Sequence, residues 1–153
     1  MFFLFTAGLV FFFACTDSVL YEANINIPNE TWNADSLATF QVDVRDTSSV
    51  FNIYINLRNT TNYPNSNLFL FIQTTSPEGA MLRDTLELFL ADSRGNWLGK
   101  GFGSIRDIRV PYKQHIRFPE VGSYHFNVQQ GMRASNLKGI KSIGLRVEKN
   151  KTP

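Results

Sequence analysis

The sequence predicts an all-β protein, a two-layer antiparallel β-sandwich of the Ig-like or jelly-roll-like kind. Three observations lead to this fold class. About eight or nine short segments alternate apolar with polar residues, as strands with one buried face do. Clusters of Gly, Pro, Asn, Asp and Ser separate these segments at short, regular spacing. No segment repeats its apolar residues at helical period, so two packed sheets are the architecture that buries the apolar faces.

Residues 1–14 come first and predict a leader. They carry no charge, and only Thr6 and Gly8 interrupt the apolar side chains. As a helix, a segment of this length rises about 21 Å, which is short of the ~30 Å hydrocarbon core of a bilayer. The length is typical of the apolar region of a signal peptide.

Cys15 is the only cysteine of the chain and directly follows Ala14. A small residue followed by cysteine after an apolar leader resembles the bacterial lipobox, in which the cysteine receives a thioether-linked diacylglycerol and becomes the mature N-terminus. Two features depart from that pattern: Phe12 stands where leucine is usual, and no Lys or Arg precedes the apolar run. The alternative is a buried free cysteine. The polar residues that follow favour lipidation, and a single cysteine leaves no intramolecular disulfide.

We therefore divide the chain into three parts: a lipoprotein signal peptide at residues 1–14, a lipidated N-terminus and lead-in segment at residues 15–36, and one β-sandwich domain at residues 37–153. Within the lead-in, a short alternation from Tyr21 to Ile27 favours an added edge strand. The chain after the leader is long enough for one domain and short for two.

Strands then follow in series. Residues 40–44 and 51–57 alternate apolar and polar side chains, and residues 46–49 supply the turn between them. Residues 68–72 are apolar on both faces, which predicts a strand covered on both sides, between layers or under a loop. A type I turn is expected at residues 76–79, because proline stands second and glycine fourth.

Residues 82–107 combine a strand, a turn and a glycine-rich stretch. Alternating leucines predict a strand up to Ala91, and Asp92 to Asn96 predict the turn of a hairpin. Beyond it, Gly99, Gly101 and Gly103 suit a backbone with tight bends, while Trp97 and Phe102 are expected to pack in the core. A phosphate cradle at Gly99 to Gly103 is the alternative, but the strand, glycine loop and helix that this site requires are not predicted.

The remaining segments are shorter. We expect a strand at residues 105–110 that ends at Pro111, a further short one at 116–118, and strands at 124–128 and 143–147. Residues 131–139 are expected to hold one helical turn around Met132 and Leu137.

Several blocks of the sequence resemble the GldH family of gliding-motility lipoproteins from the Bacteroidota. The blocks are residues 54–61, 63–64, 66–68, 83–86, 90–92, 97–101, 111–113, 116–119, 122, 124, 126, 132–133, 139–140, 143–146 and 148. The resemblance implies a lipid-anchored cell-envelope component that serves the gliding apparatus and the type 9 secretion machinery linked to it, in the outer membrane rather than the inner. The family has no known catalytic residues, so Cys15 is the one site residue that it implies.

Little in the sequence predicts catalysis or a cofactor. His115 and His125 are separated by Pro119 and Gly122, which break a common strand register, and no third metal ligand follows from the spacing. No GxSxG motif is present, and the carboxylates are scattered. The formal net charge of +2 comes without a basic run, so nucleic acid is not an expected partner. We expect no enzyme, cofactor, metal or small-molecule substrate.

The expected activity is contact with proteins of the envelope, through the loop Asn59 to Asn67 and the stretch Trp97 to Gly103. The alternative function is a surface glycan-binding module, because aromatic rings on β-sandwiches stack on sugars; Tyr54, Tyr63, Trp97 and Tyr112 are the candidate rings. The triplets that begin at Asp17, Asp35 and Asp84 also resemble the Asp-(Ser/Thr)-apolar acceptor for O-glycosylation in the same phylum.

Overall fold

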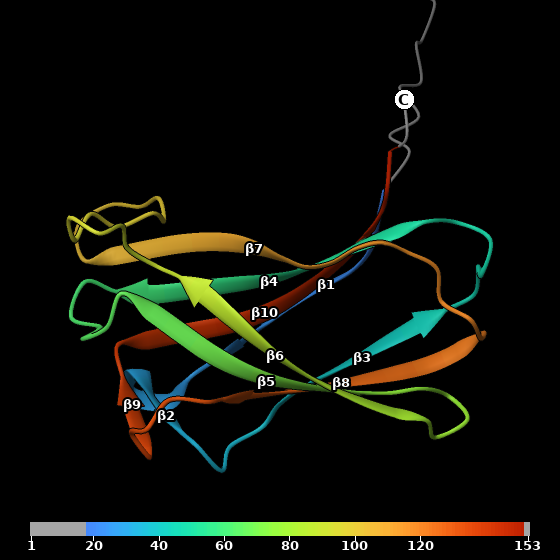
Figure 1. Cartoon of the computed structure of the whole chain (residues 1–153), viewed down its shortest axis with the longest axis horizontal. Helices are drawn as coiled ribbons and strands as arrows, with labels where there is room; N and C mark the ends of the chain where they lie inside the picture. The colour runs from blue at the N-terminus through green and yellow to red at the C-terminus, as the bar shows by residue number, and fades with distance from the viewer. Residues whose placement is uncertain (1–17, 152–153) are drawn as a thin grey trace, which may run out of the picture.

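The computed structural model describes residues 18–151 of the chain (Figure 1). Within these residues it contains ten strands and one 3-10 turn. The elements are β1 Val19–Asn26, η1 Pro28–Glu30, β2 Thr31–Asn33, β3 Ala38–Val44, β4 Phe51–Thr60, β5 Asn67–Thr75, β6 Met81–Phe89, β7 Ile105–Ile116, β8 Gly122–Gln130, β9 Asn136–Lys138 and β10 Ile140–Lys149. The prediction of an all-β, antiparallel, two-layer protein is confirmed. Among these residues the structure contains no helix of the length and apolar character needed to cross a bilayer.

The strand order identifies the topology. One four-stranded sheet has the order β1-β10-β4-β7, and the other has the order β3-β8-β5-β6. Apart from the small β2-β9 sheet, the strands pair in a nested order: β1 with β10, β3 with β8, β4 with β7, and β5 with β6. This nested pairing is the folded-over hairpin of a jelly roll, so the jelly-roll alternative is the one that the chain adopts.

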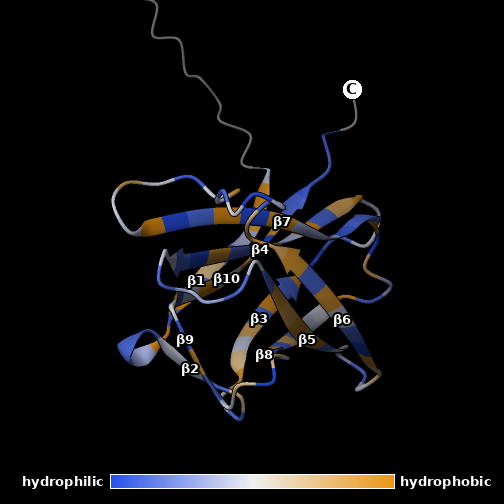
Figure 2. Ribbon diagram, turned by 60° about the vertical axis from the view of Figure 1, so that its left-hand side comes forward, coloured by the Kyte–Doolittle hydropathy of each residue, from blue (hydrophilic) through white to orange (hydrophobic). Residues whose placement is uncertain are grey.

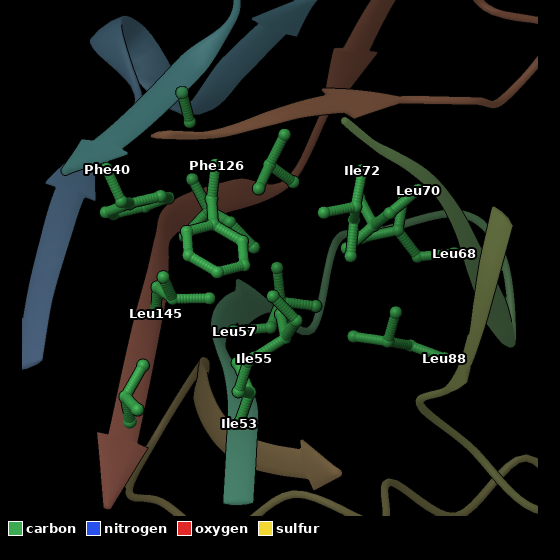
Figure 3. Close-up of a cluster of buried hydrophobic side chains, with 14 of the residues drawn as sticks. Phe40, Ile53, Ile55, Leu57, Leu68, Leu70, Ile72, Leu88, Phe126 and Leu145 are labelled. Carbon is green, nitrogen blue, oxygen red and sulfur yellow. The ribbon is translucent and has the colours of Figure 1, made fainter. Parts of the chain in front are cut away.

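The core lies between the two four-stranded sheets, where alternate side chains of each strand meet. Ile53, Ile55 and Leu57 of β4 face Phe126 of β8 and its neighbours (Figure 3). The same alternation appears along β7 as bands of apolar and polar residues (Figure 2). Each large apolar side chain buried here stabilises the fold by about 1.5–3 kcal/mol. The period-two pattern that predicted β4 is therefore explained by a strand with one face in the core.

The folded body starts earlier than the boundary expected at residue 37. Throughout its length β1 pairs with β10, with Val19 opposite Glu148 and Asn26 opposite Ser142, so the edge strand expected at Tyr21 to Ile27 is confirmed. β1 buries its inner side chains only partly, so its alternation of apolar and polar residues is weak in the sequence. The signal peptide and Cys15 lie outside the described residues.

The apolar run from Leu68 to Ile72 forms an inner strand, as expected, because β5 lies between β8 and β6. Leu68, Leu70 and Ile72 are buried in the core, whereas Phe69 and Phe71 point to the outer face and are only half-buried. The Gly131 N–H donates to the Phe69 carbonyl at 2.7 Å and extends the pairing of β8 with β5 by one residue. The prediction of burial on both faces is therefore met only for the inner face, and Phe69 and Phe71 remain half-buried on the outer one.

The turns at residues 46–49 and 76–79 are confirmed. The Asp46 carboxylate accepts the N–H groups of Ser48 at 2.9 Å and Ser49 at 3.1 Å. In the second turn the Gly79 N–H donates to the Ser76 carbonyl at 3.0 Å. Both turns are local, which is why residue type alone predicts them.

Three predictions for residues 105–139 are wrong. Pro111 does not end a strand, because β7 continues to Ile116, so residue 116 closes β7 and residues 117–118 follow it without forming a strand of their own. Proline is tolerated there because β7 is an edge strand and its own register shift, with Tyr112 as the extra residue, lies beside Pro111. Residues 131–139 contain no helical turn either. Asn136 to Lys138 form β9, in which Leu137 pairs with the buried Trp32 of β2.

Candidate contact surface

The two segments predicted as contact surfaces meet at one end of the sandwich (Figure 1). The Thr61 N–H donates to the Ser104 carbonyl at 2.8 Å, and the Leu90 N–H donates to the Ser66 carbonyl at 2.7 Å. The loop of residues 61–66 is therefore bonded to both ends of the loop of residues 90–104. We call these two loops together the two-loop end.

The loop of residues 90–104 begins with the predicted turn. The Asp92 carboxylate accepts the N–H groups of Arg94 and Asn96, both at 2.9 Å, and Gly95 supplies the positive φ of 83°. The expected hairpin stops at once, because only Ala91 and Trp97 form a bridge before the chain crosses to β7 in the other sheet. The prediction of a turn is confirmed, and that of a full hairpin is wrong.

The glycines bring this loop close to the start of β7. Lys100 and Asp107 exchange two backbone hydrogen bonds, at 2.9 and 2.7 Å. A Cβ atom on Gly101 would lie 2.1 Å from the Ile105 carbonyl oxygen, so no side chain fits there. The expectation that these glycines serve backbone architecture is confirmed. The loop has no strand leading into a helix, so the phosphate-cradle alternative lacks its context.

Phe102 stands at the tip of the loop and is 97% exposed, so the prediction that it packs in the core is wrong. Leu98 in the same loop is 50% exposed, and Phe89 at the end of β6 is 60% exposed. Trp97, in contrast, packs partly against the core. No sequence signal separates a buried aromatic side chain from an exposed one in an irregular loop. The exposure of Phe102 is therefore known only from the structure.

The loop of residues 61–66 contributes less apolar surface than expected. Tyr63 is buried, and its hydroxyl donates to the Asn67 carbonyl at 2.7 Å. Burial raises the pKa of Tyr63 to about 12. Residues 59 and 60 belong to β4 and are buried too. The exposed residues are Asn62, Pro64 and Ser66, so this loop forms a polar rim beside the apolar tip.

A polar bridge connects the edges of the two sheets between β6 and β7. Asp84 accepts a hydrogen bond from the Tyr112 hydroxyl at 2.6 Å and forms an ion pair with the Lys113 ammonium at 3.0 Å. The Tyr112 hydrogen bond, followed by Lys113, holds the pKa of Asp84 below its ordinary value. Burial, helped by the Asp84 carboxylate, raises the pKa of Tyr112.

An apolar groove of about 300 Å³ opens beside this bridge, at the end of the sandwich opposite the two-loop end. Leu82 of β6 lines the groove and is 55% exposed. The rest of the lining is Ile53, Thr74, Tyr112, Lys113, Ile116, Arg117, Phe118, Pro119, Tyr124 and Phe126.

Ion pairs cover the outer face of the β1-β10-β4-β7 sheet. Arg146 contacts both Glu22 and Glu148, and Glu22 also pairs with Arg109 at 3.0 Å. Arg58 pairs with Asp107 at 2.6 Å nearby. Because these side chains neutralise one another at the surface, the face is best explained as a solvated ion-pair network, in which each pair contributes little stability.

The histidines lie in different sheets, His115 in β7 and His125 in β8. Within residues 18–151, no three His, Cys, Asp or Glu side chains come close enough together to hold a metal ion. The four candidate rings for sugar stacking do not form an exposed row either. Tyr63 is buried, while Tyr54, Trp97 and Tyr112 are half-buried on different elements. The arrangement therefore gives the glycan-binding alternative no platform.

A jelly-roll domain with an apolar loop tip and paired surface charges defines a β-sandwich suited to binding other macromolecules through its loops and edges. A family model described as GldH lipoprotein matches residues 19–147, which is most of the chain. The chain therefore belongs to the GldH lipoprotein family, and the resemblance found in the sequence is confirmed.

Two relatives agree with this assignment. The chain is 35% identical over 155 residues to the gliding motility lipoprotein GldH homolog of Christiangramia forsetii, covering 97% of this chain and 94% of that protein. It is 32% identical over 146 residues to the gliding motility lipoprotein GldH of Flavobacterium johnsoniae, covering 91% of this chain and 90% of that protein.

Proposed function

We propose that this protein is a non-enzymatic, lipid-anchored component of the cell envelope that supports gliding motility and the associated type 9 secretion machinery through protein–protein contacts. The observation that carries the proposal is the exposed Phe102 ring at the two-loop end, beside Leu98. The names of the two relatives support the gliding role.

The two-loop end has the properties of a preformed contact surface. Its backbone is fixed by hydrogen bonds between the loops and to β7, so little conformational entropy is lost when a partner binds. Burial of the Phe102 ring in a partner would stabilise the complex by about 1.5–3 kcal/mol. The polar residues around the tip supply the rim that surrounds such an anchor.

A lipid on Cys15 would leave this end free. The Ser18 carbonyl accepts the Lys149 N–H at 2.7 Å, and Lys149 pairs with Phe51 at the start of β4. Thr60 at the other end of β4 pairs with Ile105, next to the two-loop end. The chain from Cys15 to Ser18 reaches about 10 Å when extended. The tether would thus hold the far end of the sandwich near the membrane. We propose the outer membrane rather than the inner for this anchor, as the family resemblance implies.

Replacing Cys15 by serine tests the anchor. We expect the wild-type protein to sediment with the membrane fraction and Cys15→Ser to leave it, because the acyl chains supply the membrane affinity. Mass spectrometry of the wild-type N-terminus should find residue 15 first and diacylated. A wild-type chain that begins at Met1 with a free Cys15 thiol would contradict lipidation.

Changing the loop tip tests the contact surface. The double change Leu98→Ser with Phe102→Ser should lower the recovery of motility or secretion subunits about tenfold or more in affinity purification from the native host, because the apolar anchor is lost. The control is Val121→Ser, an apolar residue at the opposite end that is 61% exposed, and it should leave recovery unchanged. If wild-type protein recovers no such subunit, the proposed function is wrong; if the double variant recovers as much as wild type, the tip is not the contact.

A further inference from the structure

Strand β6 is an open edge of its sheet. The order β3-β8-β5-β6 leaves one side of β6 without a partner strand within residues 18–151 (Figure 1). All nine of its residues pair with β5 in one uninterrupted register. The edge strands β1 and β7 of the other sheet are interrupted by register shifts, and β7 also contains Pro111. Interruptions of this kind prevent further pairing, and β6 has none of them.

The sequence of β6, Met-Leu-Arg-Asp-Thr-Leu-Glu-Leu-Phe, is complementary to itself when two copies run antiparallel about Thr85. Arg83 of each copy then lies opposite Glu87 of the other, and Met81 lies opposite Phe89. All four side chains point to the outer face of the sheet, because they alternate with the inward Leu86 and Leu88. A shift of two residues in either direction would place Arg83 opposite Thr85 or Phe89 and lose both charge pairs.

The side chains that would pair lie on the accessible outer face of this edge. Met81 is 71% exposed and Phe89 is exposed as well, so the apolar pair would lose water on association. The Arg83 guanidinium lies over the Phe71 ring, 4.9 Å from its centroid. Glu87 accepts a hydrogen bond from the Asn67 amide at 2.8 Å. Both charged groups therefore lie on the outer face, where they contact β5, and each would turn from β5 toward the open edge to meet the second copy.

We propose that β6 pairs with β6 of a second copy of this chain, antiparallel about a two-fold axis at Thr85, and joins two four-stranded sheets into one. The contact is isologous, so each residue pair occurs twice. Opposite charges on directly opposed residues fix the register, and like charges there destabilise it. The pairing lies outside the two-loop end and goes beyond the contacts proposed above, so each can hold without the other.

Charge reversal tests the register. The full-length lipidated protein in detergent should sediment as two copies, whereas Arg83→Glu alone and Glu87→Arg alone should each sediment as one copy, because like charges then face each other twice. An equimolar mixture of the two variants should sediment as two copies again, since every opposed pair regains opposite charges. Recovery in the mixture also shows that both variants are folded.

A wild-type protein that sediments as one copy would overturn the proposal. Variants that remain paired on their own, or a mixture that stays as single copies, would overturn it equally, because the charge pairs would then not define the interface.

A cysteine at the axis gives an independent readout. Thr85 lies opposite its own copy, and the Cβ atoms of directly opposed residues are about 4.5–5.5 Å apart, close to the spacing of a disulfide. Under mild oxidation Thr85→Cys should form a covalent dimer on a non-reducing gel. The control is Thr39→Cys, an exposed threonine on β3 at the other edge of the same sheet. Equal cross-linking of the two variants would contradict pairing through β6.

Discussion

Replacing Phe126 by alanine is expected to lower the free energy of unfolding by about 3–5 kcal/mol, the usual effect of removing a buried aromatic ring. Phe126 is 1% exposed and lies in β8, an inner strand of its sheet. Its backbone is paired on both sides, with Phe40 of β3 and Thr74 of β5, so the strand cannot move in to fill the cavity. A domain of this size has a total stability of about 5–15 kcal/mol, so the loss is a large share of it.

Urea denaturation of the purified protein measures this loss. The matched control is Phe102→Ala, which removes the same atoms from the exposed loop tip and should change the free energy of unfolding by less than about 0.5 kcal/mol. Comparable losses in the two variants would mean that Phe102 is buried or that Phe126 is not, and would contradict the description of the core and of the two-loop end together.

Gly139→Ala is expected to lower the free energy of unfolding by about 2–4 kcal/mol, through a strained backbone and a steric overlap. Gly139 joins β9 to β10 at a φ of 90°, and a Cβ atom there would lie 2.7 Å from the Tyr63 Cα atom. The backbone cannot shift away, because the Gly139 N–H donates to the Glu30 carbonyl and its carbonyl accepts the Thr60 N–H, both at 2.8 Å.

The control for this variant is Gly79→Ala. Gly79 has nearly the same φ, 91°, but no atom lies within 4 Å of the added Cβ position. It should therefore show the conformational cost alone, about 1–2 kcal/mol. The difference between the two variants in thermal or urea unfolding measures the overlap with Tyr63. If both lose the same stability, the close packing of Gly139 against Tyr63 is wrong.

The parts of the fold that sequence reasoning could predict are those determined locally. The alternation of apolar and polar residues in β4 reflects its one buried face. The turn at residues 46–49 depends on the Asp46 carboxylate and the N–H groups of the next residues. The predictions for Pro111 and for residues 131–139 are wrong because the conformations of these residues depend on distant partners. Pro111 fits within β7 because β7 is an edge strand. β9 forms because Leu137 pairs with Trp32, which lies about a hundred residues earlier in the chain.

The same distinction applies to the candidate surface. Each of its two loops was predicted from turn-forming residues, but their meeting depends on hydrogen bonds such as that from Thr61 to Ser104, which join distant parts of the chain. The exposure of Phe102 and the open edge of β6 follow from strand order, which a single sequence does not specify. The apolar character of these residues is visible in the sequence, whereas their accessibility is a property of the fold.

The nested strand pairing has a practical consequence for anyone who modifies the chain. β1 and β10 are neighbours, and Val19 at the start of β1 lies opposite Glu148 near the end of β10. The first and last strands therefore reach the same end of the sandwich, opposite the end that carries Phe102. A fluorescent reporter or purification handle fused behind residue 153 would emerge close to the tether. With the proposed lipid on Cys15 in place, such a fusion would crowd the lipid headgroups before it obstructed a partner bound at the exposed Phe102 ring.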